Sequence, residues 1–272
     1  MNRRQNAIPL LALLALVLAT PGCGLINKLR AKDTLNEGVR EFNKGHYEVA
    51  EQKFARALEL SPDLNNARLF YARAVNARFD QSLVEEQGLK TIQAYNEIIA
   101  NNPNDEKAID TAMAFQANVY NQLAKAVPEK AEEYKQKYRE TLLKRADLPS
   151  ATQQVKADVN YTLGVNYWEE AYALDQQYIT KSPPQPIPPD KVEKIRPLVQ
   201  KAHEYLERAI SIDPNYANAY FYSKLAYLQD SYIDPTPEGK KKALAKADEM
   251  QKKYLEIQDK QKEQAASQPA SS

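Results

Sequence analysis

Residues that could carry out chemistry are few and far apart along the chain. The two histidines, His46 and His203, are widely separated, and the single cysteine, Cys23, lies near the start. A zinc site needs three or four such ligands brought together. His203 and Glu204 open like a helical zinc-protease motif, but Glu207 stands where that motif requires a second histidine. We therefore predict neither a metal site nor a cofactor.

Other patterns typical of enzymes are missing from the sequence. Glu169 and Glu170 are adjacent carboxylates, but neighbouring residues of a helix point about 100° apart, so they do not form an acid–base pair. The chain has 7 glycines among 272 residues and no GxSxG, Walker or GxGxxG pattern. The sequence predicts that the protein is not an enzyme and has no catalytic residues.

The elements that position these side chains must be mostly helices. Lys and Arg total 37 and Asp and Glu total 36, so the net charge is +1. This balance argues against a strongly basic nucleic-acid binder and against an acidic disordered chain. The scarcity of glycine argues against a turn-rich β-sandwich.

Residues 1–22 have the pattern of an export signal. Two arginines precede the apolar stretch 7–19, which is shorter than the about 20 residues that a membrane-spanning helix needs. Thr20 and Pro21 come after this stretch, and Gly22 and Cys23 follow them. This arrangement resembles a bacterial lipoprotein precursor, although Thr20 stands where leucine is usual.

The resemblance implies a signal peptide at 1–22, lipidation of Cys23 by acyl chains such as palmitate, and a lipidated N-terminal linker at 23–30. It also implies an exported protein that is lipid-anchored to the bacterial membrane and faces the periplasm. Gly24 favours the outer membrane, because some bacteria read aspartate at this position as an inner-membrane signal. An ordinary signal peptide with an incidental cysteine, and an uncleaved anchor, are the alternatives.

A loose repeat runs through the rest of the chain, where residues 48–63 recur as 200–215. In each copy a mixture of small and large apolar residues falls at i, i+4, i+7 and i+8, which is one face of a helix. These residues are Ala50, Phe54, Ala57 and Leu58 in the first copy, and Ala202, Leu206, Ala209 and Ile210 in the second. A proline follows each helix, where it prevents continuation.

This pattern resembles the tetratricopeptide repeat (TPR), a pair of antiparallel helices about 34 residues long. The residues on family positions include Gly38, Tyr47, Ala50, Phe54 and Ala57. The resemblance implies an all-α fold, a right-handed superhelical solenoid of about five TPR-like helical hairpins with insertions, over residues 31–260. We expect a proline-rich loop at 179–197 and a disordered tail at 261–272.

In TPR proteins the first helix of each pair lines a concave groove that binds partners. Amide side chains in such a groove can donate to and accept from a peptide backbone. Carried onto this chain, the groove positions include Asn66, Arg73, Asn76, Asn118, Tyr161, Val165 and Trp168. The predicted partners are proteins or peptide segments of the cell envelope, and not nucleic acids or small-molecule substrates. The alternative is that part of this strip belongs to the core.

The functional interpretation is a membrane-anchored TPR lipoprotein that acts as a non-catalytic protein–protein interaction scaffold in the bacterial cell envelope. Two alternatives stay open. One is an assembly factor for outer-membrane barrels or pilus machinery. The other is a cell-wall or glycan-binding accessory protein whose tyrosine-rich surface stacks on sugars.

Overall fold

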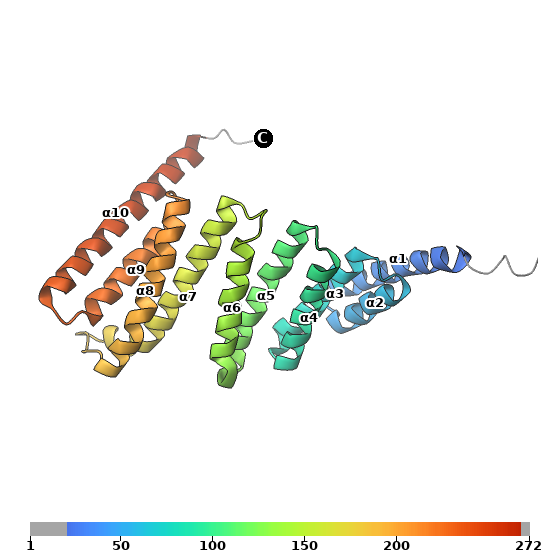
Figure 1. Cartoon of the computed structure of the whole chain (residues 1–272), viewed down its shortest axis with the longest axis horizontal. Coiled ribbons are helices and arrows are strands. Elements are labelled where there is room, and N and C mark those ends of the chain that lie inside the picture. Colours follow the sequence, from blue (N-terminus) through green and yellow to red (C-terminus); the bar gives the residue numbers. More distant parts are fainter. Residues whose placement is uncertain (1–20, 268–272) are drawn as a thin grey trace, which may run out of the picture. The chain divides into compact units, whose positions relative to one another are not determined.

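The computed structural model describes residues 21–267, and every regular element in that range is helical (Figure 1). The all-α class that the sequence predicts is thereby confirmed. The helices are α1 (Pro21–Asn43), α2 (Tyr47–Leu60), α3 (Asn65–Ser82), α4 (Glu85–Asn101), α5 (Glu106–Ala126), the 3-10 turn η1 (Pro128–Lys130), α6 (Ala131–Ala146), α7 (Gln153–Ile179), α8 (Pro189–Ile212), α9 (Ala217–Ile233) and α10 (Pro237–Ser267).

The chain divides into two compact units, the first ending at Lys135 and the second beginning at Gln136. In the first unit, each helix from α1 to α4 packs on the next one along the chain. In the second unit, α7 to α9 do the same, and α7 also packs on α9. Consecutive helices therefore form hairpins in both units, which confirms the predicted succession of helical pairs.

A close contact between a glycine and a large apolar side chain joins the helices of one hairpin in each unit. A Cβ atom added to Gly38 on α1 would lie 2.5 Å from the Phe54 ring on α2, and one added to Gly164 on α7 would lie 2.6 Å from Leu206 Cγ on α8. These pairs occupy equivalent repeat positions. Glycine is needed there because a methyl group would occupy space that the large side chain already fills.

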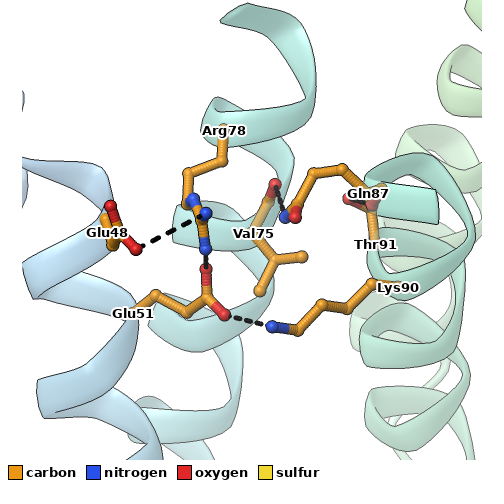
Figure 2. Close-up of polar contacts among 7 residues, drawn as sticks. All are labelled: Glu48, Glu51, Val75, Arg78, Gln87, Lys90 and Thr91. Atoms are coloured by element: carbon orange, nitrogen blue, oxygen red, sulfur yellow. Dashed lines mark hydrogen bonds and ion pairs between the residues drawn. The ribbon is translucent and has the colours of Figure 1, made fainter. Parts of the chain in front are cut away.

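Glu51 on α2 connects three helices of the first unit (Figure 2). Its side chain is 8% exposed and accepts a hydrogen bond of 2.7 Å from Arg78 on α3 and another from Lys90 on α4. Beside it, Gln87 on α4 donates to the backbone oxygen of Val75 on α3 at 3.2 Å. Two cations thus offset the cost of burying one carboxylate, and the network fixes α2, α3 and α4 together.

The proline-rich loop is shorter than the predicted 179–197. Helix α7 ends at Ile179 and α8 begins at Pro189, so the non-helical segment is 180–188. Proline is well tolerated in the first helical turn, and Pro197 lies inside α8. The helix continues through Pro197 because Ile195 and Val199 are fully buried in the core of the second unit. Apolar periodicity therefore outweighs the proline.

The remaining predicted boundaries lie near the two ends of the chain. Residues 1–20 of the predicted signal peptide, and residues 268–272 of the predicted tail, lie outside the described residues. The predicted linker 23–30 is helical, because it forms part of α1. Helix α10 runs to Ser267, beyond its expected end near Lys260. The predicted disorder is therefore wrong for residues 261–267, which continue α10. Lipidation at Cys23 and disorder of residues 268–272 stay predictions.

Candidate partner-binding site

The first unit holds four of the residues predicted to bind a partner. Asn66, Arg73 and Asn76 lie on α3, and Asn118 lies on α5. Asn66, Arg73 and Asn118 are exposed, whereas Asn76 is 8% exposed. Three of the four side chains are therefore accessible, and the fourth is accessible only at its edge.

Asp80 on α3 fixes the orientation of two amide side chains from different helices. Asn76 Nδ2 donates to Asp80 Oδ2 at 2.7 Å, and Gln122 Nε2 on α5 donates to Asp80 Oδ1 at 3.0 Å. A flipped amide would bring its oxygen against the carboxylate, so both amides must direct their nitrogens at Asp80. We call Asn76, Asp80 and Gln122 the amide site.

Buried polar atoms at and beside the amide site have no hydrogen-bond partner among the described residues. They are Asn76 Oδ1, Gln122 Oε1 and the hydroxyl of Tyr95 on α4. The Tyr95 side chain is 1% exposed and stacks on Phe115 with a centroid distance of 5.3 Å. Burial raises the pKa of Tyr95, while the positive charge of Arg73 opposes this rise. The two amide oxygens can only accept, so they are suited to N–H groups of a ligand.

A pocket of about 280 Å³ lies next to Tyr95 in the first unit. Its apolar lining comes from Leu69 on α3, from Tyr95 and Ile98 on α4, and from Ala112 on α5. Polar residues also line it, including Asn66, Asn65, Asn102 and Thr111. An apolar lining with a few convergent polar groups is typical of a ligand pocket.

The second unit holds the aromatic part of the predicted strip. Tyr161, Val165 and Trp168 lie on α7 and are half-buried. Trp168 stacks on Tyr172 at 5.1 Å, and Tyr222 on α9 meets Trp168 edge-on at 5.3 Å and Tyr161 edge-on at 5.7 Å. Burial raises the pKa of Tyr161. We call Tyr161, Trp168, Tyr172 and Tyr222 the aromatic site.

Beside the predicted residues, the structure places others that were not predicted from the sequence. Asp80 lies four residues after Asn76 on α3, and Gln122 lies four residues after Asn118 on α5. Each is one helical turn further along the same face. Extending the predicted strip by one turn would have found both residues. Tyr222 on α9 could not be paired with Trp168 in this way, because their contact depends on how α9 packs on α7.

The two histidines are each engaged by a carboxylate within one unit. His46 Nδ1 lies 2.7 Å from Glu41, and His203 Nε2 lies 2.7 Å from Asp230. Within residues 21–267, no group of three or more His, Cys, Asp or Glu side chains could hold a metal ion. In the same range, no helix is both long and apolar enough to cross a membrane.

Comparison with known proteins gives structural likeness alone. No family model matches the sequence, and no curated protein matches it significantly. Two crystal structures of MamA align with it. The first has 20% identity and a TM-score of 0.47, and the alignment covers 86% of this chain and 94% of that one. The second has 21% identity and a TM-score of 0.44, and the alignment covers 83% of this chain and 96% of that one. A monomeric mutant of IFIT1 with Gppp-AAAA aligns at 17% identity and TM-score 0.34, over 83% of this chain and 50% of that one. With every TM-score below 0.5, these likenesses assign no family and no function.

Proposed function

We propose that the protein is a non-catalytic scaffold that binds an extended protein segment at the amide site. The observation that carries this proposal is the pair of buried amide oxygens on Asn76 and Gln122, which Asp80 holds in place. Backbone N–H groups of a partner are donors that would satisfy these oxygens. Asp80 already orients the acceptors, so in this protein only the side chains that cover them must move when the partner's N–H groups approach.

The neighbouring pocket supports selection among partner segments. Its lining from Leu69, Ile98 and Ala112 could take an apolar side chain. Exposed Asn66 lines the same pocket. Its amide could hydrogen-bond the partner's backbone on either side of the residue whose side chain enters the pocket. Backbone recognition would then give affinity, and the pocket would give specificity.

The proposed location is the bacterial cell envelope, with a lipid anchor at Cys23 and the helices facing the periplasm. The support is the sequence pattern, in which the sole cysteine directly follows Gly22, four residues after the apolar stretch ends at Ala19. Several acyl chains on one residue give effectively permanent membrane attachment. The outer membrane is favoured by Gly24, and partners in the same bilayer would gain effective concentration. Helping to assemble outer-membrane barrels or pilus machinery is a more specific form of this proposal.

Site-specific crosslinking in native membranes tests the binding site. A photo-crosslinking amino acid replaces exposed Asn118 on α5, in the parent chain and in the double variant Asn76→Leu with Gln122→Leu. We expect the yield of discrete protein adducts to fall by about tenfold or more in the double variant, because two hydrogen bonds to the partner are lost.

The matched control is Gln81→Leu with Asn101→Leu, which changes two exposed amides of the same unit. This control should retain the parental adducts. Parental adduct yield in the Asn76→Leu, Gln122→Leu chain would contradict the proposed site.

Replacement of Cys23 tests the proposed anchor separately. The parent chain should incorporate a labelled palmitate analogue and sediment with membranes. Cys23→Ala should incorporate none and appear in the soluble fraction. A parent chain that takes up no label, or a Cys23→Ala chain that stays on the membrane, would overturn the lipoprotein proposal.

The aromatic site favours a second candidate function, binding to cell-wall glycan. The rings of Trp168, Tyr172 and Tyr222 form a half-buried group that could stack on sugar faces. In that case purified protein should co-sediment with isolated cell-wall glycan in the absence of other proteins, and Trp168→Ala should abolish this binding. Co-sedimentation that is insensitive to Trp168→Ala would exclude the aromatic site as its cause.

A further inference from the structure

Helix α1 carries a second apolar surface in its first turns. Ala31 and Leu35 are buried in the first unit, and they define the core-facing side of the helix. Before them, Leu25, Ile26 and Leu29 are 65%, 50% and 57% exposed. We call these three residues the membrane foot, for the reasons that follow.

The membrane foot points away from the core of the first unit. At about 100° per residue, its three side chains lie about 120–160° around the helix axis from Ala31. A Cβ atom added to Gly24, one residue before the foot, would meet nothing within 4 Å. The foot is therefore a separate apolar surface, not a frayed part of the core.

Positive charges surround this apolar surface. Lys28, Arg30 and Lys32 fall within residues 24–32, which contain no acidic residue. All three are exposed, and Lys28 also pairs with exposed Asp63 at 3.0 Å. The first acidic residue after the foot is Asp33. The chain as a whole has a net charge of only +1, so this basic character is local to the start of α1.

We propose that Leu25, Ile26 and Leu29 insert into the surface of the phospholipid bilayer while Arg30 and Lys32 face its anionic headgroups. This inference rests on the proposed lipid anchor at Cys23. Leu29 is six residues beyond Cys23, which is about 9 Å along a helix, so an anchored chain cannot hold the foot far from the headgroups. Apolar residues flanked by cations are what an interfacial helix presents to a membrane.

The consequence is that the first turns of α1, and not its later turns at Asn36, lie in the membrane surface and hold the first unit in one orientation. A lipid anchor alone would allow that unit to swing on its attachment. With the foot inserted about 5–10 Å into the headgroup region, α1 becomes a rigid connection between bilayer and scaffold.

Labelling of an introduced thiol tests the inference in the full chain. Acylation of Cys23 would leave no other thiol, so Leu29→Cys and Asn36→Cys each supply a unique one. Asn36 is exposed and lies on the same side of α1 as Leu29, about two turns further from the foot. Each variant is treated with a membrane-impermeant maleimide in freeze–thawed membranes, and each rate is divided by that of the same variant unfolded in urea.

The normalised rate of Leu29→Cys should be at least about tenfold below that of Asn36→Cys, because insertion removes the thiol from water. The difference should persist when the purified lipidated protein is placed in vesicles of phosphatidylethanolamine and phosphatidylglycerol. Equal rates in membranes would overturn the inference. Protection in native membranes that disappears in pure vesicles would also overturn it, because a protein would then be covering the foot. Failure of the anchor is recognised independently, since the parent chain would then incorporate no palmitate analogue.

Discussion

Gln122 on α5 donates a 3.0 Å hydrogen bond to Asp80 on α3, across 42 residues of sequence and between the first helices of two consecutive hairpins. Asp80 also holds Asn76 at 2.7 Å. One carboxylate therefore orients two amides whose oxygens are buried without donors. Such acceptors cost free energy in the isolated protein, and a partner that supplies N–H groups recovers it. The same unpaired oxygens that would favour partner binding therefore lower the stability of the isolated protein.

This opposition predicts an uncommon result for Asn76→Leu combined with Gln122→Leu. Each unpaired buried acceptor costs about 1–3 kcal/mol, and exposed Asp80 can be solvated when its amide partners are removed. The thermal midpoint of unfolding should be unchanged or higher, while partner crosslinking falls. Thermal unfolding followed by circular dichroism measures the first quantity. A clear drop in the midpoint would mean that the amides serve the fold rather than a partner.

Removing the charge of Glu51 should weaken the first unit. Glu51→Gln leaves Arg78 and Lys90 close together without the carboxylate that they share. Because both cations are partly exposed, we expect a loss of about 1–3 kcal/mol in the free energy of unfolding. Urea unfolding measures it. Glu59→Gln is the control, because Glu59 pairs with Arg56 through side chains that are 64% and 61% exposed, and it should change stability by at most about 0.5 kcal/mol.

The close glycine contacts predict that adding one methyl group destabilises each unit. Gly38→Ala would push against Phe54, and Gly164→Ala against Leu206. Overpacking of this kind costs about 1–3 kcal/mol in the free energy of unfolding. Gly24→Ala is the matched control, since its Cβ would meet nothing within 4 Å. Unfolding by urea should separate the three variants, and equal stabilities would contradict the tight packing of these hairpins.

The helical pairs could be predicted from the sequence because their determinants are local and periodic. Phe54 and Leu206 fall on the predicted apolar faces of their helices, and each packs against a glycine of the partner helix. The extent of the proline-rich loop could not be predicted in this way. Whether Pro197 ends a helix depends on how much apolar surface Ile195 and Val199 bury, and that is a tertiary property.

The candidate site was predictable as a face but not as a set of contacts. Asn76 and Asn118 were placed on adjacent first helices by repeat position alone. The bond from Gln122 to Asp80 was not, because it depends on the spacing between α3 and α5. The unpaired oxygen atoms could not be inferred at all, since they follow from which end of each amide faces the carboxylate.

Stability should also depend on the protonation of Asp175 in the second unit. This residue on α7 is fully buried, and Gln229 Nε2 on α9 donates to its Oδ2 at 2.9 Å. The other carboxylate oxygen and Gln229 Oε1 have no partner among the described residues. Burial raises the pKa of Asp175 from 3.8 to about 6. A protonated carboxyl could donate to Gln229 Oε1 while accepting from Nε2, and so pair both groups.

The sign of the pH dependence follows from this raised pKa. Between about pH 4 and pH 6 the folded chain keeps a proton on Asp175 that the unfolded chain has lost, so the folded state binds more protons. The contribution of Asp175 to stability is therefore present at low pH, falls as pH rises through this window, and stays low above it. The difference between the two limits is on the order of 2–3 kcal/mol.

Asp175→Asn mimics the protonated acid, because an amide can exchange two hydrogen bonds with Gln229 at any pH. We expect the variant to be more stable than the parent at pH 7 and to lose the decline between about pH 4 and pH 6 that Asp175 causes. Urea unfolding of both chains at pH 4.5 and pH 7.5 measures this, and the difference between them removes the contributions of other titrating groups. Asp158→Asn is the control, since Asp158 shares α7 and accepts from Tyr216 at 2.9 Å in a partly buried contact. If the stabilities of the parent and of Asp175→Asn change in parallel with pH, then Asp175 is ionised in the folded protein throughout this range.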